Sequence, residues 1–296
     1  MCERYIRDGH DVTGIDNFCT GNARNVAGFA GSPRFRLVEA DVSAGMPALG
    51  NVGLVLHFAS PASPFDYARL ARETLAVNSR GTDAACELAE RCGARFVYAS
   101  TSEVYGEPLV HPQAEGYWGN VNSVGPRACY DEGKRFGEAL VTTRARTGAL
   151  DARIVRIFNT YGPRMRATDG RVVPAFVDAA LNGRPFVLFG AGTQTRSFCY
   201  VDDLVEGVVR LAALESQPAT PIVNLGNPEE FSVAELAALV AELAGVPLHV
   251  AREPLPPDDP TRRRPDIARA QALLDWRPRV TLREGLAKTI AHARSR

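Results

Sequence analysis

The apolar residues of this chain follow two alternating patterns. Short runs rich in β-branched residues predict strands over residues 12–15, 35–38, 54–58, 95–99 and 152–158. Apolar residues recur at helical spacing over 68–92 and 127–147, and each stretch stops before a glycine that can close a helix, Gly93 or Gly148. Strands that alternate with helices indicate an α/β fold, in which helices cover both faces of a parallel sheet.

The second half of the chain has a more mixed pattern. It predicts helices over 172–182, 201–214 and 232–244, the last with a capping box from Ser232 to Glu235, and strands over 186–189 and 222–225. Residues 254–265 contain five prolines and predict an extended loop, which two short helices follow. We expect a nucleotide-binding domain over residues 1–165 and a smaller lobe over 166–296, parts of which return to the first domain.

Composition narrows the class of protein. The 296 residues include 34 basic and 34 acidic side chains, and this balance argues against a nucleic-acid binder or a polybasic membrane contact. No apolar run approaches the roughly 18 residues that span a bilayer, so we expect a cytoplasmic protein. The six cysteines form no C-x-x-C pair and none lies near a histidine at zinc-ligand spacing, which predicts reduced, mostly buried thiols and no metal site.

A tyrosine and a lysine are the strongest local candidates for chemistry. Tyr130 and Lys134 are four residues apart and therefore share one face of the predicted helix. An ammonium beside a phenol lowers the pKa of the phenol and makes it a usable base near neutral pH. This spacing often arises by chance, but Lys134 and Lys288 are the only lysines among the 34 basic residues. A lysine in a chain that otherwise uses arginine indicates a position that a bulkier guanidinium cannot fill.

Polar side chains follow the predicted strands, at the edge where open parallel sheets bind ligands. Thr101, Ser102 and Glu103 follow the strand over 95–99; they form either a catalytic cluster or a cap for the next turn. Asp16 ends the first strand, where a carboxylate accepts hydrogen bonds from the adenosine ribose of NAD or forms an Asx turn. Asp41, after the next strand, lies where it could reach the adenine.

Two other polar features are open to two interpretations. His57 ends an apolar strand, and we expect a core imidazole there rather than a catalyst. Residues 262–264 are three consecutive arginines in the proline-rich loop. They form a solvated surface or place one guanidinium on a substrate carboxylate or phosphate.

Longer strings along essentially the whole chain resemble the UDP-glucuronic acid decarboxylases, also called UDP-xylose synthases, which are extended short-chain dehydrogenase/reductases. The strings are FASPASP (58–64), STSEVYG (100–106), YWGNVN (117–122), GPRACYDEGKR (125–135), RIFNTYGPRM (156–165), DGRVV (169–173), QTRSFCY (194–200) and NLGNPEE (224–230). The resemblance implies a Rossmann-type doubly wound parallel sheet with a smaller C-terminal substrate-binding lobe. It also implies an NAD cofactor, a UDP-sugar substrate and a homodimer formed through the predicted helices over 68–92 and 127–147.

The resemblance also implies roles for particular residues. The dehydrogenase triad is Thr101, Tyr130 and Lys134, and the residues of the decarboxylation stage are Ser102, Glu103 and Arg263. The positions that match NAD contacts, besides Tyr130 and Lys134, are Asp16, Asn17, Phe18, Thr20, Gly21, Asp41, Val42, Phe58, Ala59, Ser60 and Thr160. The positions that match the sugar-nucleotide pocket are Asn159, Arg171, Val172 and Arg196.

The implied reaction converts UDP-glucuronate to UDP-xylose by C4 oxidation, loss of CO₂ from the 4-keto intermediate and re-reduction, so that NAD is regenerated. The alternatives are a 4-epimerase or a 4,6-dehydratase of the same superfamily, which share the fold and the Tyr/Lys pair. The Thr-Ser-Glu string at 101–103 fits a decarboxylase, but the GDP-mannose dehydratases carry it as well. The Arg-Arg-Pro string at 263–265 and the YDEGKR string at 130–135 favour a decarboxylase.

The start of the chain departs from the family pattern. Family members begin with a strand and a G-x-x-G-x-x-G loop, whose glycines let the backbone approach the pyrophosphate. The paired glycines at 28 and 31 do not follow a strand, and those at 190 and 192 do not open a helix. About sixteen residues of the dinucleotide fold are therefore expected to be missing. Either the natural protein starts upstream of Met1, or the chain is a truncated, non-catalytic remnant that binds sugar nucleotides.

Overall fold

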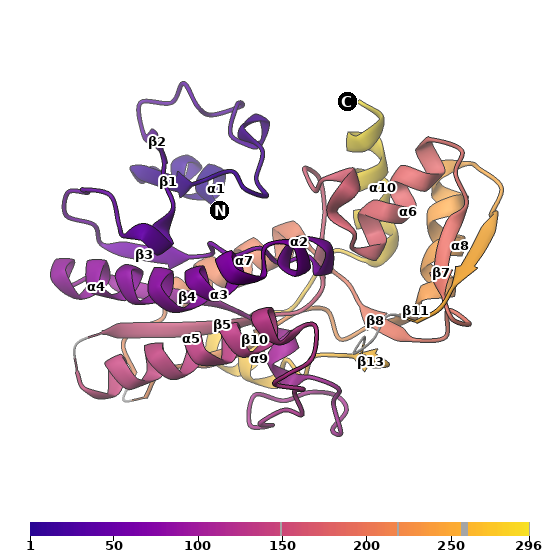
Figure 1. Ribbon diagram of the computed structural model, residues 1–296. Coiled ribbons are helices and arrows are strands. Elements are labelled where there is room, and N and C mark those ends of the chain that lie inside the picture. Colours follow the sequence, from indigo (N-terminus) through magenta and orange to yellow (C-terminus); the bar gives the residue numbers. More distant parts are fainter. Residues whose placement is uncertain (149, 218, 256–259, 296) are drawn as a thin grey trace.

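A four-stranded parallel sheet forms the centre of the computed structural model, which describes residues 1–148, 150–217, 219–255 and 260–295. Its strands are β3 (Leu54–His57), β4 (Arg95–Thr101), β5 (Asp151–Ile157) and β10 (Ile222–Leu225), in the order β10-β5-β4-β3. β1 (Val12–Asp16) and β2 (Phe35–Glu39) pair with each other as a separate parallel sheet, which Figure 1 shows above β3. All seven predicted strands are confirmed, the seventh being β7 (Phe186–Phe189).

Helices cover both faces of the central sheet, as predicted. On one face, α4 (Thr82–Cys92) and α5 (Ala128–Arg146) bury apolar residues of β3, β4 and β5. On the other face, α7 (Val201–Ala213) and α9 (Ala268–Leu274) pack on the same strands and on β10. Segments beyond residue 165 therefore complete the first sheet, since β10, α7 and α9 all contribute to it.

The helix predicted over 68–92 is wrong as one element. The segment forms α2 (Pro64–Arg69), α3 (Ala71–Ala76), a π-helical turn η3 (Val77–Gly81) and α4. Leu70 separates the first two helices with φ −114° and ψ 43°. In the π turn, Asn78 donates its side-chain amide to the Thr74 carbonyl and Ser79 donates its hydroxyl to the Leu75 carbonyl. Such side-chain bonds to the backbone compete with the regular ladder, and apolar spacing does not reveal them.

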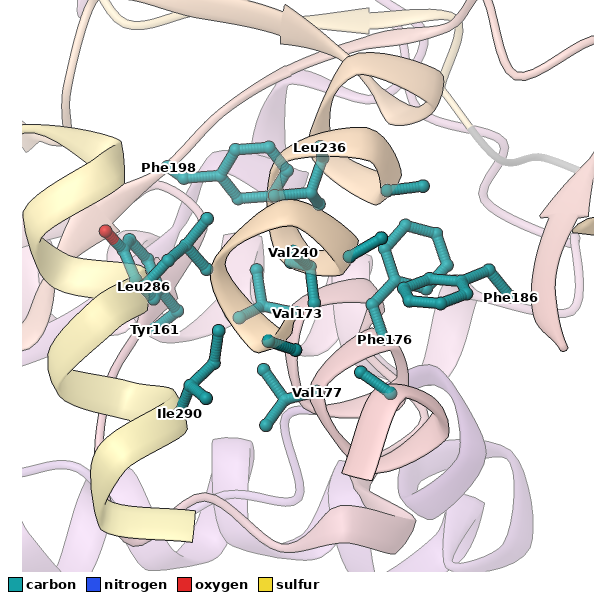
Figure 2. Packing of buried hydrophobic residues seen from close by; sticks show 14 of the residues in the cluster. Tyr161, Val173, Phe176, Val177, Phe186, Phe198, Leu236, Val240, Leu286 and Ile290 are labelled. Carbon is teal, nitrogen blue, oxygen red and sulfur yellow. The ribbon is translucent and has the colours of Figure 1, made fainter. Parts of the chain in front are cut away.

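The C-terminal lobe has its own apolar core. α6 (Val172–Leu181), α8 (Val233–Ala244) and α10 (Leu282–Arg294) surround it, together with β7, which pairs with β12 (Val250–Glu253). Figure 2 shows Leu236 and Val240 of α8 between Leu286 and Ile290 on one side and Phe176 on the other. The predicted capping box of α8 is confirmed, and α10 is 13 residues long, longer than the short helix expected.

The sequence pattern did not predict several small elements. A three-stranded sheet joins β11 (Glu230–Ser232), β8 (Thr195–Ser197) and β13 (Arg262–Arg263), and β6 (Thr160–Tyr161) pairs with β9 (Cys199–Tyr200). The remaining elements are α1 (Cys2–Arg7) and the 3₁₀ turns η1 (Ala23–Asn25), η2 (Val42–Ala44), η4 (Ser102–Tyr105) and η5 (Ala167–Asp169). Within the predicted proline-rich loop, residues 256–259 lie outside the described residues, whereas the arginines at 262–263 form a strand.

The histidine and cysteine predictions have mixed outcomes. His57 is 4% exposed and its Nε2 lies 3.1 Å from the Thr82 hydroxyl, so the predicted core imidazole is confirmed. Burial lowers the pKa of His57 to about 3, and the ring is therefore neutral. All six cysteines are free, but only Cys86 and Cys199 are buried and Cys19 is exposed, so fewer thiols are buried than predicted.

Metal-ligand clusters and membrane-spanning helices are both absent from the described residues. No group of three or more metal-ligating side chains comes together in the part of the chain that the structure describes. No helix within the same ranges is long and apolar enough to cross a bilayer.

Candidate functional site

The polar cluster predicted at the end of β4 lies there. Thr101 is the last residue of the strand, and its hydroxyl accepts the Glu103 backbone N–H at 3.2 Å, which caps η4. The Ser102 hydroxyl donates to Glu103 Oε1 at 3.4 Å. Thr101 and Ser102 are both buried. The capping interpretation is therefore correct for Thr101, and it is compatible with a catalytic one because the same turn presents Glu103.

Tyr130 and Lys134 share one face of α5, as predicted. Lys134 Nζ lies 5.9 Å from the centre of the Tyr130 ring and donates to the Ala99 carbonyl of β4 at 2.8 Å. Tyr67 of α2 stacks on Tyr130 with ring centres 5.0 Å apart. The close approach of α5 to β4 depends on Gly137, where an added Cβ would lie 2.0 Å from the Tyr98 hydroxyl oxygen.

The pKa of Tyr130 differs from the prediction. Burial raises it to about 12, opposed by a hydrogen bond with Thr101 and by the charge of Arg171. Burial also lowers the pKa of Lys134 to about 7, although the charge of Glu138 works in the opposite direction. The sequence argument considered only the attraction between ammonium and phenolate. Both groups are removed from water here, and desolvation disfavours both charged forms.

A cluster of charges surrounds Glu103. Arg127 Nη2 donates to Glu103 Oε2 at 2.5 Å and Arg263 Nη2 donates to the same oxygen at 3.3 Å. Burial alone would raise the pKa of Glu103, but the charges of Arg263, Arg127 and Arg196 outweigh it and lower the pKa to about 2. Glu103 is therefore a carboxylate at neutral pH.

Arg263 is the most buried member of this charge cluster. It is 1% exposed, and its Nε and Nη1 have no hydrogen-bond partner within the described ranges. A buried guanidinium with unused donors is costly unless an anion completes it. Nε and Nη1 lie on different edges of the guanidinium, and Nη2 already donates to Glu103, so the two unused groups are suited to single hydrogen bonds with an anionic substrate group. Of the two interpretations of the 262–264 run, the solvated surface is wrong for Arg263.

Arg127 and Asp131 were missed by the sequence analysis. Arg127 precedes α5 and its Nε lies 3.8 Å from Asp131 Oδ2, one turn further along. Burial and the charge of Glu103 raise the pKa of Asp131 to about 7. A cavity of about 290 Å³ is lined by Glu103, Arg127 and Asp131 together with 106–107, 120–122 and 260. The sequence signal that could have identified them is the i,i+4 spacing of Arg127 and Asp131, on either side of Tyr130 in the sequence.

Two of the four predicted substrate positions come close to this centre. Arg171 is near enough to Tyr130 for its charge to lower the phenol pKa, and it is paired with Asp169. Arg196 is near enough to Glu103 to lower the pKa of that carboxyl. Val172 begins α6, and the backbone carbonyl of Asn159 accepts the Cys199 N–H at 2.9 Å.

The predicted cofactor positions lie just beyond the ends of several parallel strands. Asp16 ends β1, and Asn17, Phe18, Thr20 and Gly21 follow it. Asp41 and Val42 follow β2, Phe58, Ala59 and Ser60 follow β3, and Thr160 lies beyond β5. Within each parallel sheet the strands end at one edge, and ligands of open parallel sheets bind at such edges.

The local geometry at Asp16 fits an adenosine ribose. The Asp16 carboxylate is exposed and accepts the Phe18 N–H at 2.8 Å, so the Asx turn considered as an alternative is present. An added Cβ at Gly21 would lie 3.1 Å from Asp16 Oδ2, so glycine leaves the carboxylate accessible. Asp41 forms a similar turn, in which hydrogen bonds from Ser43 lower the pKa of its carboxyl. Asp16 can accept hydrogen bonds from the ribose hydroxyls of NAD, and Asp41 stays a predicted contact of the adenine.

Comparisons with known proteins place this geometry in a family. Residues 1–226 match the NAD dependent epimerase/dehydratase family. The chain is 48% identical over 292 residues to UDP-glucuronic acid decarboxylase 1 of Danio rerio, covering 99% of this chain and 69% of that protein. It is 48% identical over 277 residues to UDP-glucuronic acid decarboxylase 3 of Arabidopsis thaliana, covering 94% and 80% of the two chains.

Solved structures agree with the family match. A dTDP-glucose 4,6-dehydratase from Streptomyces venezuelae, with NAD and TYD bound, has a TM-score of 0.89 at 26% identity, covering 99% of this chain and 92% of that one. A UDP-glucose 4-epimerase from Thermotoga maritima with UDP-glucose has a TM-score of 0.87 at 25% identity, covering 99% and 94%. With a Rossmann-type fold and the family match over most of its length, the chain belongs to the NAD-dependent epimerase/dehydratase family.

Proposed function

We propose that this protein decarboxylates UDP-glucuronate to UDP-xylose with NAD as an internally recycled cofactor. The observation that carries the proposal is Arg263, a buried guanidinium with two unused donors beside Glu103 and near the Tyr130 helix. A substrate carboxylate is the group that would satisfy those donors. The near full-length similarity to UDP-glucuronic acid decarboxylases supports the same activity.

The first stage is oxidation at C4 of the sugar. Tyr130 accepts the proton of the C4 hydroxyl, with Thr101 hydrogen-bonded to the phenol and Lys134 one turn away. NAD, held by the positions after β1, β2 and β3, would supply the hydride acceptor for C4. Because burial raises the pKa of Tyr130 to about 12, the phenolate depends on nearby positive charge, which Lys134 provides when protonated.

The second stage is loss of CO₂ from the 4-keto sugar. Its C6 carboxylate is β to the ketone, so the C5–C6 electron pair moves into the carbonyl as an enolate when CO₂ leaves. Thr101 and Tyr130 stabilise the oxygen of this enolate by hydrogen bonds. Arg263 orients the carboxylate before cleavage. Glu103, ionised at neutral pH and with Ser102 on its other oxygen, takes a proton from solvent and passes it to C5. Return of the hydride to C4 and of a proton from Tyr130 to O4 completes UDP-xylose.

We assign the remaining positions by their place around this chemistry. Arg171 and Arg196, with Asn159 and Val172, contact the sugar nucleotide. The positions after β1, β2 and β3, with Thr160, contact NAD. The two arginines add positive charge for an anionic nucleotide sugar.

A product assay tests the activity. The purified protein is incubated with UDP-glucuronate and NAD⁺, and CO₂ and UDP-xylose are measured. Release of both in equal amounts is expected. Conversion to UDP-galacturonate without CO₂ would identify a 4-epimerase instead, and the absence of any conversion would contradict the proposal.

We also propose a cytoplasmic homodimer that uses α3, α4 and α5. Leu75 of α3 and Phe136 of α5 are 48% and 52% exposed, which supports an apolar contact with a second copy. Light scattering after size-exclusion chromatography should give twice the chain mass, and Leu75→Glu with Phe136→Glu should give a monomer. Leu109→Glu, at a leucine in another segment that is 74% exposed, is the control. An unchanged mass in the double variant would contradict this interface.

A further inference from the structure

Gln113 holds the segment that carries Arg263. Its backbone N–H donates to the Arg264 carbonyl at 2.9 Å, and its carbonyl accepts the Asp266 N–H at 2.8 Å. Its side-chain Oε1 accepts the Arg264 N–H at 2.9 Å. The residues immediately after Arg263 are therefore bonded to one residue more than 140 positions earlier in the chain.

The orientation of the Gln113 amide is fully determined. Nε2 donates to the Val110 carbonyl at 2.9 Å and lies 3.3 Å from His111 Nδ1, so the oxygen has to face Arg264. Gln113 has no exposed surface. At such a site a glutamate would place a charge and an extra acceptor against the Val110 carbonyl, and an apolar residue would leave the Arg264 N–H unpaired.

Asn224 connects this attachment to the central sheet. It lies on β10, has no exposed surface, and donates its amide to the carbonyls of Gln113 at 3.0 Å and Asp266 at 3.1 Å. Its Oδ1 accepts the Tyr105 hydroxyl at 2.7 Å. The Arg263 segment is thus connected through two buried amides to the same sheet that positions Glu103.

The opposite side of the segment is held by a strand. β13 pairs in parallel with β8, which aligns Arg263 with Arg196, and the Ser197 hydroxyl donates to the Arg263 carbonyl at 3.3 Å. Strand pairing fixes Arg263 on one edge, and Gln113 fixes the following residues on the other. Between these two attachments, the guanidinium contacts Glu103 at 3.3 Å.

We infer that Gln113 is a positioning residue for the decarboxylation stage, acting through the Arg264 backbone on the guanidinium of Arg263. This inference rests on the proposed function. Gln113 makes no bond to Tyr130, Lys134 or Thr101 among its described contacts, so the C4 oxidation does not depend on it. Loss of Gln113 therefore separates the two stages of the reaction.

The test compares oxidation with CO₂ release in Gln113→Met, which keeps the side-chain length and removes the hydrogen bonds. We expect CO₂ release to fall by about tenfold, the effect of losing a buried hydrogen bond, while the initial rate of NADH formation stays within about twofold. NADH should accumulate, because re-reduction awaits decarboxylation. Thr289→Val, which removes a buried hydroxyl-to-carbonyl bond in α10, is the control and should leave the ratio of CO₂ to NADH unchanged.

A double variant separates positioning from general destabilisation. In an Arg263→Ala background, Gln113→Met should change CO₂ release by less than about twofold, since residues that act as one unit are not additive. A full tenfold further loss there, or a parallel loss of NADH and CO₂ in the single variant, would overturn the inference.

Amide hydrogen exchange gives a readout independent of turnover. A peptide that covers residues 261–266 should exchange faster in Gln113→Met than in the unsubstituted protein, because the Arg264 N–H has lost its acceptor. Unchanged exchange would overturn the inference. If the unsubstituted protein releases no CO₂, the proposed function is wrong and the role in decarboxylation is wrong with it, whereas the exchange result still decides whether Gln113 anchors Arg264.

Discussion

Replacing Glu138 by Gln should destabilise the protein through the buried arginine that it neutralises. Glu138 of α5 accepts two bonds from Arg156 of β5, at 2.8 and 2.7 Å, and one from the Ser100 hydroxyl of β4 at 2.5 Å. Arg156 and Glu138 are each 9% exposed. The Gln variant turns one accepting oxygen into an NH₂ donor that faces a guanidinium donor, and it leaves Arg156 as an uncompensated charge.

The size of the effect follows from this burial. Breaking a buried ion pair by removing one charge costs about 3–5 kcal/mol. With an unfolding entropy of roughly 2 cal/mol/K per residue, a chain of this length has an entropy near 600 cal/mol/K, so the melting temperature should fall by about 5–8 °C. Circular dichroism during heating measures this shift, and urea denaturation at 25 °C measures the free energy of unfolding.

A double variant checks the physical cause. Glu138→Met together with Arg156→Met removes both charges and keeps apolar volume, so it should recover at least half of the lost stability. A melting temperature within about 1 °C of the unsubstituted protein for Glu138→Gln, or a double variant less stable than the single one, would refute the reasoning.

Three further changes test the site and its packing. Tyr130→Phe should lower both NADH formation and CO₂ release by about 10²–10⁴-fold, and activity within twofold of normal would remove Tyr130 as the base. Asp131→Asn should weaken the pH dependence of stability. The folded pKa of Asp131 is raised to about 7 from an ordinary 3.8, so the native chain binds the extra proton between these values and loses stability as pH rises from 4 to 7. Urea denaturation at pH 4.5 and 7.5 measures the change in the free energy of unfolding with pH. An equal change in Asp131→Asn and in the unsubstituted protein would contradict the raised pKa of Asp131. Gly137→Ala forces a methyl group to within 2.0 Å of the Tyr98 hydroxyl oxygen and should cost about 1–3 kcal/mol, whereas Gly28→Ala, with nothing within 4 Å, should be nearly neutral; similar melting temperatures for the two would argue against tight packing of α5.

The strands and the active-site helix could be predicted because their signals are local. Short apolar runs rich in β-branched residues identify β3, β4 and β5. The four-residue spacing places Tyr130 and Lys134 on one face of a helix without any knowledge of the rest of the chain. The position of Thr101 and Glu103 at a strand end needed only the general rule for ligand sites in parallel sheets.

The contacts between distant segments could not be predicted in this way. Arg127, Gln113 and Asp131 take their roles from packing against segments that are remote in sequence, and no periodicity encodes that packing. The predicted decrease in the pKa of Tyr130 was wrong for the same reason, since desolvation depends on all the groups that surround the phenol. The break in the helix predicted over 68–92 also depends on individual side chains, which bond to the backbone where apolar spacing predicts a regular turn.

The contact between Glu103 and Arg263 also determines when the active site becomes complete during protein synthesis. The two residues are 160 positions apart. At a synthesis rate of about 5–20 residues per second, Arg263 is added roughly 8–30 seconds after Glu103. During that interval the nascent chain already contains the strand end, Tyr130 and Lys134, but lacks the guanidinium that would receive a substrate carboxylate. Competence for decarboxylation is therefore acquired only after the segment that carries Arg263 has been synthesised and has packed beside Glu103.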